Sequence, residues 1–146
     1  MITLDLDHDG AALGDRLRTL QTVGAVFTAV DAVDDWQAVE DRLVEAFELS
    51  RRCVERAEPL IFLVRASDVR GTRGPLPAAL AHALLSAART LAMEGARERF
   101  VVNVVAADGS IDTQEVCSVV AWLLDSRTVT GELIDLGTPK FGRLQS

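Results

Sequence analysis

The sequence contains no tyrosine, and Lys140 is its only lysine. No site in this chain can therefore use a phenol as an acid or a base, and only one position offers an amine side chain. No two glycines are separated by a single residue. The Gly-x-Gly turn, which lets backbone amides approach the pyrophosphate of a dinucleotide, is therefore absent.

Cysteine, histidine and clustered basic charge are also scarce. Cys53 and Cys117 each lie inside an apolar helical pattern, which predicts buried free thiols rather than a disulfide or a metal site. His8 and His82 are too far apart in the sequence to suggest a pair of metal ligands. The net charge is −7 and the basic residues are scattered, which argues against nucleic acid or an anionic membrane as the main partner.

Long apolar runs are missing as well. No run reaches the length of a membrane span, and the first residues lack the basic and then apolar pattern of a secretion signal. We therefore expect a protein of the cytoplasm. Apolar residues make up 49% of the 146 residues and charged residues 25%, which is an ordinary globular composition. This length predicts a single domain over residues 1–146.

Apolar runs rich in β-branched residues alternate along the chain with amphipathic helical patterns. Strands are predicted at residues 1–7, 23–30, 59–64, 100–106 and 131–136. Helices are predicted around residues 13–20, over 35–57 and 77–97, and around 116–123. On the helix over 35–57, one apolar stripe is formed by Val39, Leu43, Phe47 and Val54. The alternation predicts an α/β fold with a parallel sheet of about five strands joined by crossover helices.

Three segments carry a resemblance to a known family. The segment "RTLAMEGARERFVVNVVAADG" contains Glu94 and Asn103, and "VVAWLLDSRTVTGELIDLG" contains Thr130, Gly131 and Gly137. A third segment is "DDWQAVEDRLVEAFELSRRCVER". In this order and spacing, the chain from about residue 23 onward resembles the short-chain dehydrogenase/reductase (SDR) family. The resemblance implies a Rossmann-like three-layer sandwich with a reduced parallel sheet, without the first βαβ dinucleotide-binding unit.

The positions that match the family's catalytic residues carry the wrong side chains. The resemblance places the family's tyrosine at Pro77, its lysine at Ala81 and its asparagine near Leu43. Only Ser67 plausibly matches the family's serine. One hydroxyl cannot perform the acid–base step, because its pKa lies far from neutrality and the sequence shows no base beside it. We therefore expect a catalytically degenerate chain.

Two alignments of the first residues with the family remain open. In the alignment we favour, residues 3–17 correspond to the family's third strand and the helix after it. In the other, "GAALGDR" is a decayed glycine-rich turn whose last glycine is replaced by Arg16. Under both alignments we expect NAD(P) binding to be lost, and we expect no other cofactor.

The resemblance also implies interaction surfaces. In the family, the helices that match residues 35–57 and 77–97 pair with those of another subunit in a four-helix bundle. The interface positions predicted here are Phe47, Ala79, Ala83, Ser86 and Thr90. The small side chains permit close helix approach, although alanine also simply favours helix. Loss of the first βαβ unit would in addition uncover one apolar face of the sheet. The N-terminal helix, a second copy or another protein should cover this face, and we expect an oligomer.

The leading hypothesis is a non-catalytic structural or regulatory subunit that pairs with itself or with an active short-chain dehydrogenase. The alternative is a small non-redox enzyme, such as a dehydratase or cyclase, that reuses the cleft around Ser67. Arg65, Arg70 and Arg73 lie near that cleft and suggest an anion-binding site, although a solvated loop has the same composition.

Overall fold

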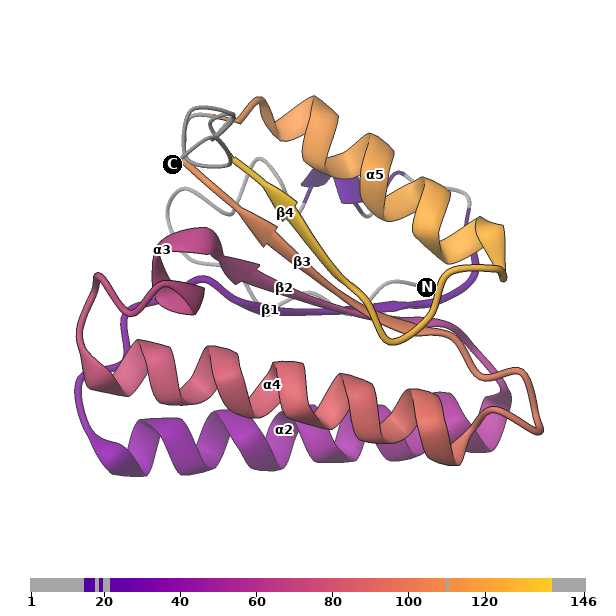
Figure 1. The fold of residues 1–146 in the computed structure, drawn as a ribbon, viewed down its shortest axis with the longest axis horizontal. Coiled ribbons are helices and arrows are strands. Elements are labelled where there is room, and N and C mark those ends of the chain that lie inside the picture. The colour runs from indigo at the N-terminus through magenta and orange to yellow at the C-terminus, as the bar shows by residue number, and fades with distance from the viewer. Residues whose placement is uncertain (1–14, 18, 20–21, 110, 138–146) are drawn as a thin grey trace, which may run out of the picture.

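The computed structural model describes residues 15–17, 19, 22–109 and 111–137. Residues 15–17 are helical, and the elements that follow are shown in Figure 1. In chain order they are β1 (Ala25–Ala29), α2 (Trp36–Arg56), β2 (Leu60–Arg65), α3 (Ala66–Val69), α4 (Pro75–Glu94), β3 (Val102–Ala107), α5 (Thr113–Ser126) and β4 (Leu133–Leu136).

The four strands form one parallel sheet in the order β1-β2-β3-β4. Ala25 lies opposite Leu60, and Leu60 lies opposite Val102, so the first three strands are in register from their first residues. The prediction of an α/β fold with a parallel sheet is confirmed. The strand predicted at residues 1–7 lies outside the described residues.

Strand β2 is buried on both faces of the sheet. Leu60, Phe62 and Val64 belong to one apolar cluster, whereas Ile61 and Leu63 belong to the cluster on the other face. This division follows from the period of two along a strand. It explains why the strand reads as a continuous apolar run rather than an alternating one.

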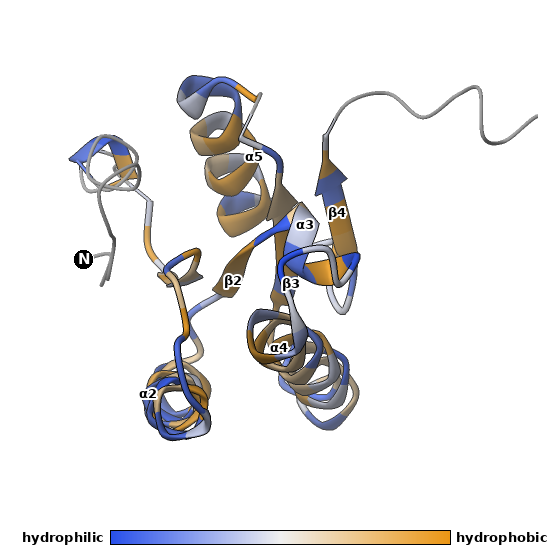
Figure 2. Ribbon diagram, turned by 90° about the vertical axis from the view of Figure 1, so that its left-hand side faces the viewer, coloured by the Kyte–Doolittle hydropathy of each residue, from blue (hydrophilic) through white to orange (hydrophobic). Residues whose placement is uncertain are grey.

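The helices lie in two layers on either side of the sheet. Helices α2 and α4 run side by side on one face, and α5 covers the other (Figures 1 and 2). Leu17 is fully buried and packs in the α5-side cluster beside Val26. The described residues of the first helix therefore help to cover this face, which is one of the three coverings that we expected.

The connection from β3 through α5 to β4 has an unusual hand. All four strands are parallel and follow one another across the sheet, while α5 lies on the face opposite α2 and α4. This crossover is therefore opposite in hand to β1-α2-β2 and β2-α4-β3. Parallel crossovers are right-handed in almost all proteins. With β1-α2-β2 and β2-α4-β3 right-handed, the connection β3-α5-β4 is left-handed.

Local signals set the ends of the long helices. The side chain of Asp35 caps α2 by accepting a hydrogen bond from the Ala38 N–H at 2.7 Å. Helix α4 begins two residues earlier than predicted, at Pro75, because proline is well tolerated in a first helical turn.

By length and composition alone α4 is apolar enough to cross a membrane, contrary to our expectation that no segment would be. A helix packed against a protein core passes the same test.

Gly24 provides a test of this packing. It has a φ of 150°, and a Cβ atom there would lie 2.7 Å from Leu124 Cδ2 and 3.0 Å from the Pro59 carbonyl oxygen. We expect Gly24→Ala to lower the free energy of unfolding by about 1–3 kcal/mol through overpacking. Urea denaturation followed by circular dichroism measures this change. Gly109→Ala is the matched control, because no atom of the described residues lies within 4 Å of its Cβ position; an equal loss in both variants would contradict the packing argument.

Candidate functional site

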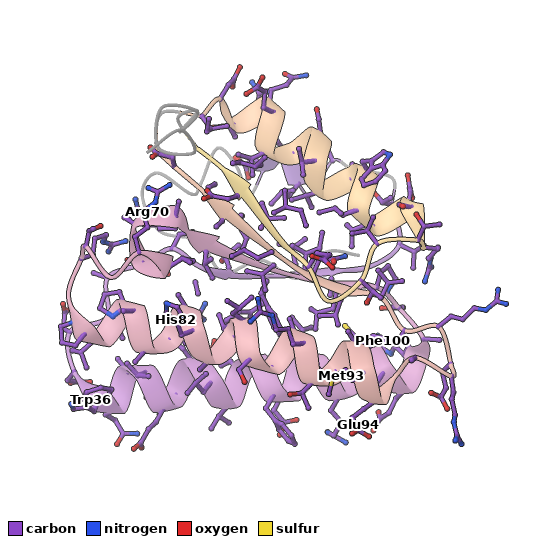
Figure 3. The ribbon with its side chains drawn as sticks, viewed as in Figure 1. Trp36, Arg70, His82, Met93, Glu94 and Phe100 are labelled. Atoms are coloured by element: carbon purple, nitrogen blue, oxygen red, sulfur yellow. The ribbon has the colours of Figure 1, made fainter. Side chains whose placement is uncertain are left out.

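Ligands of open parallel sheets bind outside the carboxyl ends of the strands. Here β2 ends at Arg65 and runs directly into α3, which carries Ser67 and Asp68. The loop after α3 leads to the start of α4, and the Val69 carbonyl contacts His82 Nε2 of α4 at 2.8 Å (Figure 3). This contact ties the short helix α3 to the long helix α4 at the edge where a site is expected.

The structure places the family's catalytic positions on different surfaces. Pro77 and Ala81 are buried on α4, one turn apart. Leu43 instead lines the groove between α2 and α4. Ser67 is half-buried, and among the described residues no side chain forms a hydrogen bond with its hydroxyl. Its backbone carbonyl accepts hydrogen bonds from the N–H and hydroxyl of Thr72. These positions therefore provide no visible base for a reaction at Ser67.

The three arginines near this edge do not converge on one point. Arg65 Nε donates to the Val30 carbonyl at 2.6 Å. Arg70 lies between the carboxylates of Asp108 and Asp135, with N–O distances of 3.9 and 3.7 Å (Figure 3). Each of these two guanidinium groups has its own acceptor, and anion binding by the set stays a prediction.

The third arginine, Arg73, pairs with a buried acid. Arg73 Nη1 lies 3.3 Å from Asp68 Oδ2. Asp68 is 2% exposed, and its second oxygen, Oδ1, has no hydrogen-bond partner. Burial raises the pKa of the Asp68 carboxyl, and the positive charges of Arg73 and Arg65 oppose the shift. Its burial and its unpartnered oxygen were not predicted, because no sequence pattern marks them.

A second candidate site lies elsewhere, between the outward faces of α2 and α4. It is an open groove of about 670 Å³. Its floor includes Phe62 of β2 and Leu84 of α4, which are both fully or almost fully buried. Its wall on α2 includes Phe47 and Val54, whose exposed fractions are 66% and 48%. The groove is therefore lined by large apolar side chains that this chain leaves open to water.

Four of the five predicted interface residues line this groove. They are Phe47 on α2 and the small residues Ala83, Ser86 and Thr90 on α4, whereas Ala79 is not among the lining residues. The stripe predicted on α2 divides: Val39 is buried against the sheet, but Phe47 and Val54 point outward. Part of the predicted stripe therefore packs on the sheet, and part of it lies on the exposed surface of the helix.

One contact beside the sheet edge was missed by the sequence analysis. The Arg42 guanidinium of α2 lies 4.4 Å from the centre of the Phe27 ring and also donates to the Thr28 carbonyl. The Thr28 carbonyl points away from β2, because the Ala25 N–H bonds toward β2 and directions alternate along a strand. Arg42 thus caps part of the outer edge of β1. Nothing in the sequence spacing signals this contact.

Three of the described helix N-termini carry groups that disfavour the pyrophosphate of a dinucleotide. Asp35 caps α2, Asp112 caps α5, and α4 begins with Pro75 and Pro77, which lack N–H groups. Helices α2 and α5 thus place a carboxylate where a bound phosphate would need free backbone amides. The described residues also hold no group of three potential metal ligands. Burial raises the pKa of the Cys53 thiol to about 11, which disfavours its reactive thiolate form near neutral pH.

Comparisons with known proteins find this fold in solved structures of dehydrogenases and of a reductase. No family model matches the sequence, and no curated protein matches it either. The solved structures that it resembles include an NADH-dependent enoyl-[acyl-carrier-protein] reductase from Aquifex aeolicus VF5 (TM-score 0.65, 15% identity), covering 85% of this chain and 64% of the reductase.

Two further solved structures are similar to this chain. Acetoin dehydrogenase from Enterobacter cloacae has a TM-score of 0.61 and 19% identity, over 94% of this chain and 74% of the dehydrogenase. A 4-hydroxyisoleucine dehydrogenase, complexed with NADH and succinate, has a TM-score of 0.59 and 15% identity, over 80% of this chain and 69% of that one. At these identities the likeness shows an SDR-like fold and no activity.

The raised pKa of Asp68 predicts a pH dependence of stability. Below the usual aspartate pKa, near 3.8, the carboxyl is protonated in both the folded and the unfolded chain. As the pH rises through the raised pKa, the folded state must ionise a buried group, so this contribution to stability is lost. We expect the melting temperature to fall less between pH 4 and pH 7 in Asp68→Asn than in the wild type.

Scanning calorimetry at the two pH values measures this difference. Asp125→Asn is the control, because Asp125 is an exposed carboxylate on α5. An unchanged pH dependence in Asp68→Asn would show that the burial of Asp68 does not govern its titration.

Proposed function

We propose that this chain is a non-catalytic, SDR-like subunit that assembles through the outward faces of α2 and α4. Its partner is a second copy of the chain or an active short-chain dehydrogenase. The observation that carries the proposal is the open apolar groove between these two helices, with Phe47 on its wall and Phe62 on its floor. We also propose that the chain works in the cytoplasm and binds no NAD(P).

The groove supports assembly because apolar side chains of this size are rarely left open to water together. Phe47 and Val54 are large and mostly or half exposed, and they stand beside a floor of core residues. Burial of apolar surface contributes about 25 cal/mol for each Å² removed from water. Soluble monomers seldom keep such a patch uncovered unless another molecule occupies it.

The two walls of the groove differ in size, which suits pairing between two such surfaces. The α2 wall carries the large side chains of Phe47 and Val54, and the α4 wall carries the small Ala83 and Ser86. In a two-fold arrangement the same surface appears on both partners, so large side chains of one copy can pack on the small side chains of the other. An active dehydrogenase of related fold would need a similar surface.

The rim of the groove is polar. Arg51 lines the groove and pairs with Glu48 and Glu55 on the same helix, both at 3.2 Å. A charged rim around an apolar centre is the usual arrangement of protein interfaces. These exposed pairs contribute little stability by themselves, so their proposed role is to define the border of the interface.

The absence of catalysis in this proposal follows from the side chains at the matched positions. Pro77 and Ala81 carry no titratable group, and no base among the described residues is hydrogen-bonded to the Ser67 hydroxyl. The carboxylates and prolines at the described helix starts disfavour a dinucleotide. The alternative is a small non-redox enzyme that uses Ser67. Among the described residues no side chain forms a hydrogen bond with the Ser67 hydroxyl, so no contact there supports this alternative.

The proposal predicts a mass in solution of at least twice the 15.8 kDa of one chain, or a stable complex with a dehydrogenase. We expect Phe47→Asp to weaken assembly on the order of thirtyfold or more, because it buries a charge in the apolar centre. Light scattering after gel filtration measures the mass. Val44→Asp is the matched control: Val44 is 60% exposed on the same helix and does not line the groove.

The possible outcomes distinguish self-assembly, assembly with a dehydrogenase, and no assembly. A wild-type dimer lost only in Phe47→Asp supports self-assembly. If the wild-type chain is a monomer, the proposal requires a complex with a dehydrogenase. Native mass spectrometry of the complex isolated from the source cells should then show that dehydrogenase bound to the wild type and not to Phe47→Asp. A monomer with no such partner, or hydride transfer from NAD(P)H by the purified chain, would overturn the proposal.

A further inference from the structure

A smaller cavity lies at the carboxyl ends of β1 and β2. It has a volume of about 250 Å³ and lies between the loop that follows β1 and the first turn of α4. Its lining residues are Ala32, Val33, Asp34, Arg73, Gly74, Pro75, Leu76 and Pro77. The exposed lining is divided almost equally between polar and apolar atoms, and it includes one cationic and one anionic side chain. Small-molecule pockets usually combine apolar walls with a few polar groups that fix the ligand's orientation.

Only one of the three arginines near this edge opens into that cavity. Arg70 is held between Asp108 and Asp135, and Arg65 is bonded to a backbone carbonyl. Arg73 lines the cavity, and 30% of its side chain is exposed. Among the described residues its guanidinium makes one side-chain hydrogen bond, to Asp68, whereas a guanidinium offers five N–H donors. Arg73 therefore has donors left for a ligand.

Asp68 holds this guanidinium from behind. Its carboxylate is almost fully buried, and one oxygen contacts Arg73 Nη1. A buried acid that pairs with an arginine fixes the direction in which the remaining N–H groups point. The loop is held as well, because the Gly71 N–H donates to the Asp68 carbonyl and the Thr72 N–H donates to the Ser67 carbonyl. Arg73 is thus a positioned cation rather than a mobile surface charge.

We propose that this cavity binds a small monocarboxylate with a short apolar chain. The carboxylate contacts the Arg73 guanidinium, and the chain packs on Val33, Leu76 and Pro77. Asp34 lies on the cavity wall and disfavours a second negative charge, so a dicarboxylate or a phosphate fits less well. Asp68 acts as a positioning residue, since it touches Arg73 and does not line the cavity.

This site is independent of the proposed assembly. The cavity shares no lining residue with the α2/α4 groove, so one proposal can fail while the other stands. Sodium hexanoate is a suitable probe, with hexanamide as its uncharged counterpart and succinate as the dicarboxylate. Isothermal titration calorimetry measures affinity, and amide chemical shifts of Val33 and Leu76 report the place of binding.

We expect saturable binding of hexanoate and weaker binding of hexanamide and succinate. Arg73→Gln should weaken hexanoate binding on the order of tenfold or more, because a charge-assisted contact is lost. Arg70→Gln is the matched control on the same loop and should keep the wild-type affinity. The proposal is overturned if hexanoate does not saturate the wild type, if hexanamide binds equally well, or if the two variants behave alike.

Asp68→Asn tests the positioning role separately. It should weaken hexanoate binding at pH 7 without lowering the melting temperature, because the fold loses a buried charge rather than a packing group. A loss of binding together with a lower melting temperature would assign Asp68 a structural role only. Unchanged hexanoate affinity in Asp68→Asn would remove Asp68 from the site.

Discussion

The burial of β2 and β3 on both faces is the constraint on which the rest of this structure depends. Leu60, Phe62 and Val64 face α2 and α4, while Ile61 and Leu63 face α5. A strand that is apolar on both sides requires a layer of helix on each side. The contacts that attach β4 serve the same centre: Asn103 of β3 donates to the Val129 carbonyl and accepts from the Glu132 N–H. Residues in the segments that resemble the dehydrogenase family thus have a structural task here that requires no catalysis.

The two helix layers differ in how completely they cover the sheet. The α2 and α4 pair leaves a groove above Phe62, and the residues of α2 that line it include the small, buried Ala46 and Ser50. Large side chains, Phe47 and Val54, border this opening instead of filling it. At the carboxyl edge of the sheet the arrangement is reversed: charged groups such as Arg70 are neutralised by neighbours within the chain. The apolar groove between α2 and α4 is therefore exposed to solvent, whereas most of the charged side chains described at the carboxyl edge of the sheet are paired within the chain.

Features that depend on a few consecutive residues were predictable from the sequence. The helix expected at 35–57 is found at Trp36–Arg56, because Asp35 is a strong capping residue. The four-residue α3 was missed, since so short a segment shows no periodicity. The apolar stripe predicted on α2 does not show which of its residues are buried: Val39 packs against the sheet, whereas Phe47 and Val54 are exposed. The Asp68–Arg73 and Arg42–Phe27 pairs depend on tertiary placement, which no local pattern encodes.

The aromatic side chains of this protein have an optical consequence. With no tyrosine, absorbance and emission in the near ultraviolet come chiefly from Trp36 and Trp122, which are 60% and 58% exposed. Trp36 is labelled in Figure 3. Indole rings that already face solvent change their surroundings little when the chain unfolds. Intrinsic fluorescence is therefore a poor reporter of folding for this molecule, and a blue shift of its emission would instead indicate that another surface has covered one of the two rings.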